Sequence, residues 1–299
     1  MEHDTQYQNL LVQLDKLYRH CRQGSYQTRA RYYEAMKRLC RYLADTYHLE
    51  RLANLAPKHI EAYAAHLRQE GKSPSTIKTD LAAIRFFHDQ MPNPRYELPS
   101  NQELALERRA FGTVDRAWSE EEFRRMCALA EADGKEDYVT LFHLARDTGL
   151  RIHECFRIDT SMVRHALRTH ALTVTCKGGL RRTVGLSDDL RGRLRRQAEQ
   201  TARGQKLFVA PEEQTHTAIN TLQAYILLNR SRVQDPGAAR DITFHGLRHT
   251  FAAEQYKALT ARGLSREAAE QRVAELLGHR RRDMARIYLT SVQPDTPGP

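Results

Sequence analysis

The chain has 299 residues, enough for two ordinary domains, and 47 Lys and Arg against 37 Asp and Glu give it a formal charge of +10. Because charged residues of both signs make up 28% of the chain, this balance favours a globular protein that binds a polyanion over a disordered basic tail. The absence of any run of about 18 apolar residues excludes a membrane span, and the polar start has no signal-peptide core, so we expect a cytoplasmic protein.

Four amphipathic helices are predicted in the first hundred residues, because apolar residues recur there at helical spacing. The four stretches are residues 7–18, 33–43, 58–68 and a stretch that starts at Ser73. Gly24 separates the first two, and Pro57 begins the third at a first-turn position, where proline is favourable. Residues 1–100 are therefore predicted to form one helical bundle.

The helical periodicity fades over residues 91–112, where proline-rich segments are typical of an interdomain connection. We place the linker at residues 101–115 and a second domain at residues 116–299. Order resumes at Ser119, which can form a capping box with Glu122.

A helix over residues 137–147 is predicted next, and it ends at Thr148 and Gly149. The convincing β signal follows, with two short strands over residues 170–175 and 182–186 on either side of a turn. The remainder is predicted to be helical, with a break near residues 235–237. The predicted fold class is mainly α with a small β-sheet: an N-terminal helical bundle and a C-terminal α+β domain.

The cysteines and histidines suggest neither disulfides nor a metal site. Five cysteines stand at wide intervals without a CxxC pair, and they are expected to be buried apolar fillers. They are Cys21, Cys40, Cys127, Cys155 and Cys176. The 14 histidines include no HExxH or other compact ligand cluster, so no metal and no other cofactor is expected.

Candidate chemistry is confined to four segments of the second half. They are residues 148–154 with Arg151 and Glu154, the hairpin turn with Lys177, residues 245–249 with His245 and Arg248, and residues 276–279 with His279, followed by Tyr288. Each is weak when taken singly, since a charged or aromatic side chain on a helix usually faces solvent or packs.

Spacing makes the combination more informative. His245 and Arg248 are three residues apart and share a helix face, with Thr243 placed to cap that helix. An imidazole and a guanidinium at a helix N-terminus suit a phosphate group, because free N–H groups and the helix dipole point the same way. Gly278 can end the preceding helix, and Asp283 can cap a short helix that contains Tyr288.

These motifs, taken in order over residues 116–292, resemble the tyrosine recombinase (phage integrase) family. The matching pieces are the Thr-Gly-Leu-Arg-x-x-Glu box, a hairpin lysine, His-x-Leu-Arg-His, Leu-Gly-His and a tyrosine at the family's distance from that histidine. Residues 20–90 look like the family's core-binding domain. The resemblance implies a site-specific recombinase that cuts and rejoins DNA through a 3′-phosphotyrosine.

For the phosphate itself, the resemblance implies four residues. Tyr288 would attack the scissile phosphate, and Arg151 and Arg248 would hold its non-bridging oxygens. His279 would add a hydrogen bond to the same phosphate. The phosphodiester energy is kept in the phosphotyrosine, so neither ATP nor a metal is expected.

For proton transfer and for support of the site, the resemblance implies three further residues. His245 would accept the tyrosine proton, Lys177 would protonate the leaving 5′-oxygen, and Glu154 would support the site without reacting. The expected partner is a double-stranded DNA recombination site bound by a homotetramer, with possible accessory DNA-bending proteins, no membrane, and a nucleoid-associated location.

Two departures from the simplest family members bear on the biological role. The segment between Arg248 and His279 is longer than in the chromosome-dimer-resolving Xer proteins, and only eleven residues follow Tyr288, which leaves no long C-terminal helix. We therefore favour integration or excision of a mobile element. Xer-like dimer resolution, a type IB topoisomerase, and a non-catalytic DNA-binding relative remain alternatives.

Overall fold

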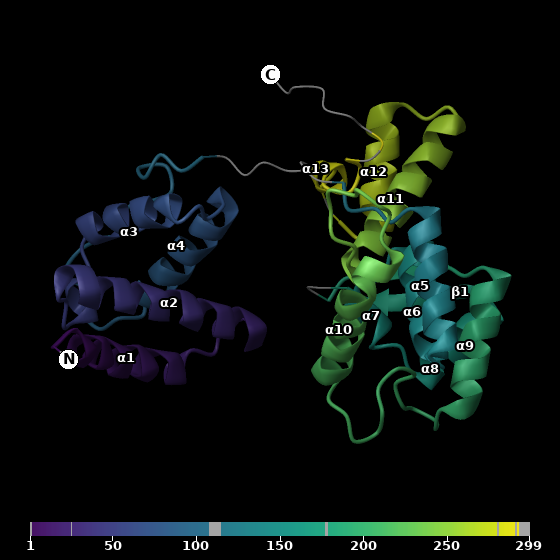
Figure 1. The fold of residues 1–299 in the computed structure, drawn as a ribbon, viewed down its shortest axis with the longest axis horizontal. Coiled ribbons are helices and arrows are strands. Elements are labelled where there is room, and N and C mark those ends of the chain that lie inside the picture. Colours follow the sequence, from purple (N-terminus) through teal and green to yellow (C-terminus); the bar gives the residue numbers. More distant parts are fainter. Residues whose placement is uncertain are drawn as a thin grey trace. The chain divides into compact units, whose positions relative to one another are not determined.

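The computed structural model describes residues 2–24, 26–107, 115–176, 179–279, 281–290 and 292. Contacts within the chain divide it into two units, Met1–Ala110 and Phe111–Pro299 (Figure 1). No described helix is long and apolar enough to cross a membrane.

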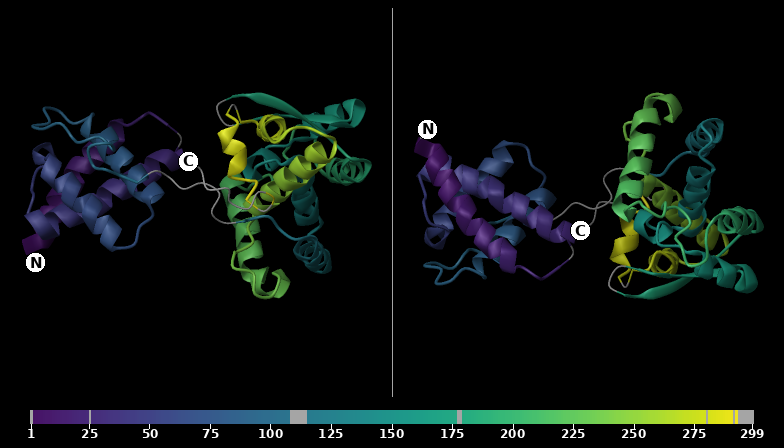
Figure 2. Two further views of the ribbon diagram at one scale, coloured as in Figure 1. Left: turned by 90° about the horizontal axis from the view of Figure 1, so that it is seen from above. Right: turned by 90° about the horizontal axis from the view of Figure 1, so that it is seen from below.

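The first unit is a helical bundle. Its elements are α1 (Glu2–His20), α2 (Tyr26–Tyr47), the short 3-10 helix η1 (Leu52–Asn54), α3 (Pro57–Gln69) and α4 (Pro74–His88). The four predicted helices are thus confirmed, with α1 lying along α2 (Figure 2). Their apolar faces meet in one core, in which Leu10, Met36 and Phe87 are fully buried.

The segment after α4 packs back onto this bundle. The Arg85 guanidinium donates to the Pro99 carbonyl at 2.8 Å, and Arg68 donates to the Leu104 carbonyl at 3.1 Å. Leu104 itself is buried in the bundle core. The first part of the predicted linker, up to residue 107, therefore belongs to the first unit, because an apolar side chain and two carbonyls find partners there. Residues 108–114 lie outside the described residues.

The second unit is mainly helical, with a small two-stranded sheet at its edge, which confirms the predicted fold class (Figure 1). Its helices are α5 (Glu120–Ala132), α6 (Glu136–Thr148), α7 (Ile152–Cys155), α8 (Thr160–Thr169), α9 (Asp188–Gln200), α10 (Thr215–Val233), α11 (Phe244–Ala261), α12 (Arg266–Leu276) and α13 (Asp283–Arg286). Strands β1 (Ala171–Thr175) and β2 (Arg181–Gly185) pair antiparallel, with Val174 opposite Arg182. All five cysteines are buried and free, as predicted.

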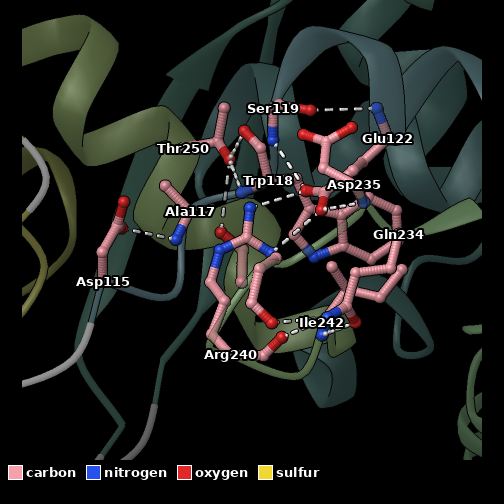
Figure 3. Close-up of polar contacts among 12 residues, drawn as sticks. Asp115, Ala117, Trp118, Ser119, Glu122, Gln234, Asp235, Arg240, Ile242 and Thr250 are labelled. Atoms are coloured by element: carbon pink, nitrogen blue, oxygen red, sulfur yellow. Dashed lines mark hydrogen bonds and ion pairs between the residues drawn. The ribbon is translucent and has the colours of Figure 1, made fainter.

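A polar network fastens the start of α5 to the segment before α11 (Figure 3). Ser119 and Glu122 form the predicted capping box, and the fully buried Glu122 carboxylate also pairs with Arg240, whose Nη2 lies 2.6 Å from Oε2. The Trp118 indole donates to the Thr243 carbonyl at 2.8 Å. These contacts fix the position at which α11 begins.

Gly246 makes this close contact possible. A Cβ atom there would lie 2.4 Å from the Arg116 carbonyl oxygen and 2.6 Å from the Trp118 indole nitrogen. Real Cβ atoms do not approach other atoms so closely, so the second residue of the His-Gly-Leu-Arg segment must be glycine for α11 to pack here.

Candidate active site

The loop between α6 and α7 is built around Gly149. This residue ends α6 in the left-handed conformation, at φ 63°, and a Cβ there would lie 2.5 Å from a Phe251 ring carbon. Two residues later, Arg151 precedes α7 and is fixed by Glu154, which accepts hydrogen bonds from the Arg151 backbone N–H at 2.9 Å and from its Nη1 at 3.0 Å. The short turn thus holds one guanidinium in place.

Glu154 is almost fully buried, and it is ionised in spite of that. Burial alone would raise the pKa of its carboxyl group, but the hydrogen bond from the Arg151 backbone and the charges of Arg182 and Arg151 hold that pKa below its usual value. As an anion, Glu154 therefore holds Arg151 and Arg182 by ion pairs.

Helix α11 places Arg248 in the interior, where 1% of its surface is exposed. Its guanidinium donates to the Gly149 carbonyl and, at 2.5 Å, to the Leu277 carbonyl. Burial lowers the pKa of Arg248 to about 10, so the group stays charged at neutral pH. Thr243 occupies the predicted N-cap position, but its side chain makes no capping hydrogen bond; its carbonyl accepts from the Trp118 indole.

His279 follows α12 as predicted. Gly278 adopts φ 72° and donates to the Glu275 carbonyl, while His279 donates from its backbone to the Ala274 carbonyl, which closes the helix. The His279 ring Nε2 lies 3.3 Å from Nη2 of both Arg151 and Arg248. Guanidinium groups only donate, so Nε2 accepts and the ring proton is on Nδ1.

Tyr288 lies two residues beyond the end of α13 and not within a helix, which corrects the prediction. Asp283 does not cap α13, because it is the first residue of that helix and its carboxylate pairs with Arg281 at 3.0 Å. Tyr288 is 6% exposed and packs with Leu277 and Leu289 in a small apolar cluster.

Three histidines and one arginine surround the Tyr288 ring. The ring centroids of His249, His245 and His279 lie 4.7, 5.7 and 5.7 Å from that of Tyr288. The Arg248 Cζ atom lies 5.3 Å from the same centroid. The predicted residues Arg151, His245, Arg248, His279 and Tyr288 therefore come together in one cluster of one chain, although Arg151 and Tyr288 are far apart in sequence.

All three histidines are neutral at pH 7. Burial, followed by neighbouring charges, lowers the pKa of His249 to about 3 and that of His279 to about 4. His245 is more exposed, and partial burial with the charges of Arg248 and Arg116 also lowers its pKa. A neutral imidazole has one free lone pair and can accept a proton.

Sequence reasoning missed Arg182 and His249. Arg182 points to the buried face of β2, the same face as Val184, and its Nη2 lies 3.2 Å from Glu154 Oε2. Because side chains alternate between the two faces of a strand, the sequence could have placed Arg182 on the inward face, and an inward arginine is a signal of a functional or paired position. His249 is 2% exposed and stands one helical turn after His245, so the i, i+4 spacing could have revealed it.

Lys177 lies outside the described residues. Among the residues that are described, no group of three or more His, Cys, Asp or Glu side chains is arranged to hold a metal ion. The charge of the site comes from its arginines: among the described residues, Arg151 and Arg182 pair with the Glu154 carboxylate, on which the Arg248 charge also acts. This leaves two uncompensated positive charges in a mostly buried place, which suits a phosphate group that gains negative charge in its transition state.

Comparison with known families and structures covers both units. Residues 117–293, more than half of the chain, match the phage integrase family, and residues 12–91 match the phage integrase N-terminal SAM-like domain. No curated protein sequence matches the chain.

Three solved structures have a similar fold. A lambda integrase tetramer bound to a Holliday junction is 19% identical, with a TM-score of 0.65 over 97% of this chain and 80% of that chain. For the Tn1549 transposon integrase with circular intermediate DNA, the identity is 15% and the TM-score 0.61, over 92% and 94%. XerH recombinase bound to its difH substrate is 17% identical, with a TM-score of 0.61 over 93% and 80%. The chain belongs to the phage integrase family, the tyrosine-type site-specific DNA recombinases.

Proposed function

We propose that Tyr288 is the nucleophile that cuts DNA in this recombinase. Its phenolic oxygen attacks the scissile phosphorus, the bond from phosphorus to the 5′-oxygen breaks, and a 3′-phosphotyrosine and a free 5′-hydroxyl result. A 5′-hydroxyl of the partner strand reverses the step and joins the new strand. The observation that carries this proposal is the position of the Tyr288 ring, which lies among three neutral histidines and 5.3 Å from the Arg248 guanidinium.

The phosphate is held by Arg151, Arg248 and His279. The two guanidinium groups converge on His279 Nε2 at 3.3 Å each, so a phosphate oxygen that replaces this nitrogen as their acceptor meets donors from both. The anion also favours a second proton on the His279 ring, whose Nε2 then donates to the phosphate. Charge that develops in the transition state is met by groups that are already fixed, which lowers the barrier.

Two residues move protons in this scheme. His245, neutral at pH 7, accepts the Tyr288 proton. Lys177 gives a proton to the leaving 5′-oxygen, a role that follows from the family resemblance. Glu154 holds Arg151 and takes no proton.

The proposed partner is a double-stranded recombination site. The helical unit, together with the segment up to residue 107 that packs onto it, is the core-binding domain, and residues 116–299 are the catalytic domain; the N-terminal SAM-like match at residues 12–91 supports the first of these. The DNA-bound dimers and the tetramer among the structures of similar fold support a homotetramer on DNA. Integration or excision of a mobile element, aided by accessory DNA-bending proteins, is the proposed role, based on the long segment that forms α11 and α12.

Covalent trapping tests the chemistry. Wild type and Tyr288→Phe are incubated with nicked duplexes from the DNA that flanks the gene, followed by denaturing gels. We expect a protein–DNA band with wild type and none with Tyr288→Phe, while both bind the duplex with similar affinity. Tight binding without any covalent band in the wild type would refute the proposal.

A further inference from the structure

Arg182 has no part in the scheme above, although its side chain is 7% exposed and lies within the site. Its guanidinium joins three segments. Nη1 donates to the Leu276 carbonyl at the end of α12, and Nη2 donates to the Gly149 carbonyl at 3.1 Å and to Glu154 Oε2 at 3.2 Å. Strand β2 is thereby tied to the loop that contains Arg151 and to the helix end that precedes His279.

Arg248 makes a parallel bridge between the same two places. It donates to the same Gly149 carbonyl and to the Leu277 carbonyl, one residue beyond the carbonyl bound by Arg182. The last carbonyls of a helix lack partners within the helix and attract cations, so two guanidinium groups are well suited to this position. Removing Arg182 leaves the Leu276 carbonyl without this donor and the Gly149 carbonyl with one donor in place of two.

We propose that Arg182 is a positioning residue for strand cleavage, which sets the relative placement of Arg151, Arg248 and His279 through the Gly149 and Leu276 carbonyls and Glu154. The inference rests on the proposed function. Arg182 does not touch DNA in this scheme, and its contribution is to the geometry of the groups that do. A shift of about 1 Å in such groups costs about 100-fold in rate.

The experiment compares full-length wild type, Arg182→Met and the control Arg181→Met, which changes the neighbouring exposed arginine of β2. Each forms covalent adduct on the nicked duplexes used for Tyr288, made either with the normal scissile phosphate or with a methylphosphonate. The methyl group replaces a charged oxygen, so less charge needs to be neutralised by correctly placed arginines.

We expect Arg182→Met to form adduct about 100-fold more slowly than wild type on the phosphate, with DNA affinity within about threefold. On the methylphosphonate the deficit relative to wild type should shrink to about tenfold or less. Arg181→Met should match wild type on both duplexes. If Arg182→Met does not fold, Arg182→Lys keeps the charge but has a single nitrogen in place of Nη1 and Nη2, so it does not reproduce the bridge, and it should show the same selective deficit.

Two results would overturn the inference: adduct formation by Arg182→Met at the wild-type rate, or an equal loss on both duplexes, which is the mark of a general structural defect. Failure of the proposed function is recognised separately, because wild type itself would then form no adduct on the normal phosphate.

Discussion

Gly149→Ala is the substitution for which the structure gives the most complete expectation. Two effects add at this position. At φ 63° an alanine sits in the left-handed region, which costs about 1–2 kcal/mol. Its Cβ would also lie 2.5 Å from a Phe251 ring carbon and 3.1 Å from a Leu277 methyl carbon, and such overpacking costs about 1–3 kcal/mol.

Gly134→Ala is the matched control. Gly134 follows α5 at φ 67°, in the same unit, but a Cβ there would meet nothing within 4 Å. The Gly134→Ala variant therefore has the backbone strain without the overpacking. The effect of Gly→Ala on the unfolded chain is common to both variants. We expect the free energy of unfolding, measured with urea, to fall by about 1–3 kcal/mol more in Gly149→Ala than in Gly134→Ala.

Strand cleavage gives a second measure of the same variant. Because the Gly149 carbonyl accepts from Arg182 and Arg248, displacement of this loop should slow adduct formation even where the variant is fully folded, while Gly134→Ala cleaves like wild type. Equal unfolding free energies in the two variants would refute the packing argument. A folded Gly149→Ala that cleaves at the wild-type rate would refute the link between this carbonyl and the site.

Arg248→Lys keeps the charge but loses the forked contact to two carbonyls, so single-turnover cleavage should fall by about 10²–10³ with nearly unchanged DNA affinity; equal losses in both assays would contradict this. Glu122→Ala leaves the largely buried Arg240 without its carboxylate and should lower the free energy of unfolding by about 3 kcal/mol, and a loss below about 1 kcal/mol would show that solvent replaces the pair. Because the pKa of His249 is depressed to about 3, the unfolded chain takes up a proton near pH 6.5 that the folded chain does not, so stability falls as the pH falls from 7 towards 5. Between pH 7 and pH 5, the free energy of unfolding of His249→Gln, measured with urea, should fall by about 2 kcal/mol less than that of wild type. If the two free energies fell in parallel with pH, this would argue against a neutral buried His249.

The sequence by itself determined the local structure and the family. The capping box at Ser119, the ends of α6 and α12 at Gly149 and Gly278, and the helix that presents His245 and Arg248 depend on residues at most four or five apart. Such contacts are encoded in spacing, because the geometry of a helix fixes which neighbours can meet. The ordered motifs then indicated tyrosine recombinase chemistry.

Only the tertiary structure decided how the site is assembled. Segments that are distant in the chain meet where Arg151 contacts His279 and where His249 contacts Tyr288. The same packing excludes Arg248 from solvent. Arg182 looked like an ordinary strand residue until its three acceptors were seen to come from the 148–154 segment and from the end of α12. Asp283 pairs with Arg281 and does not cap α13, since a nearby guanidinium competes with the backbone for a carboxylate. Sequence spacing specifies which groups a helix end or strand presents, but packing decides which of them meet in one cluster.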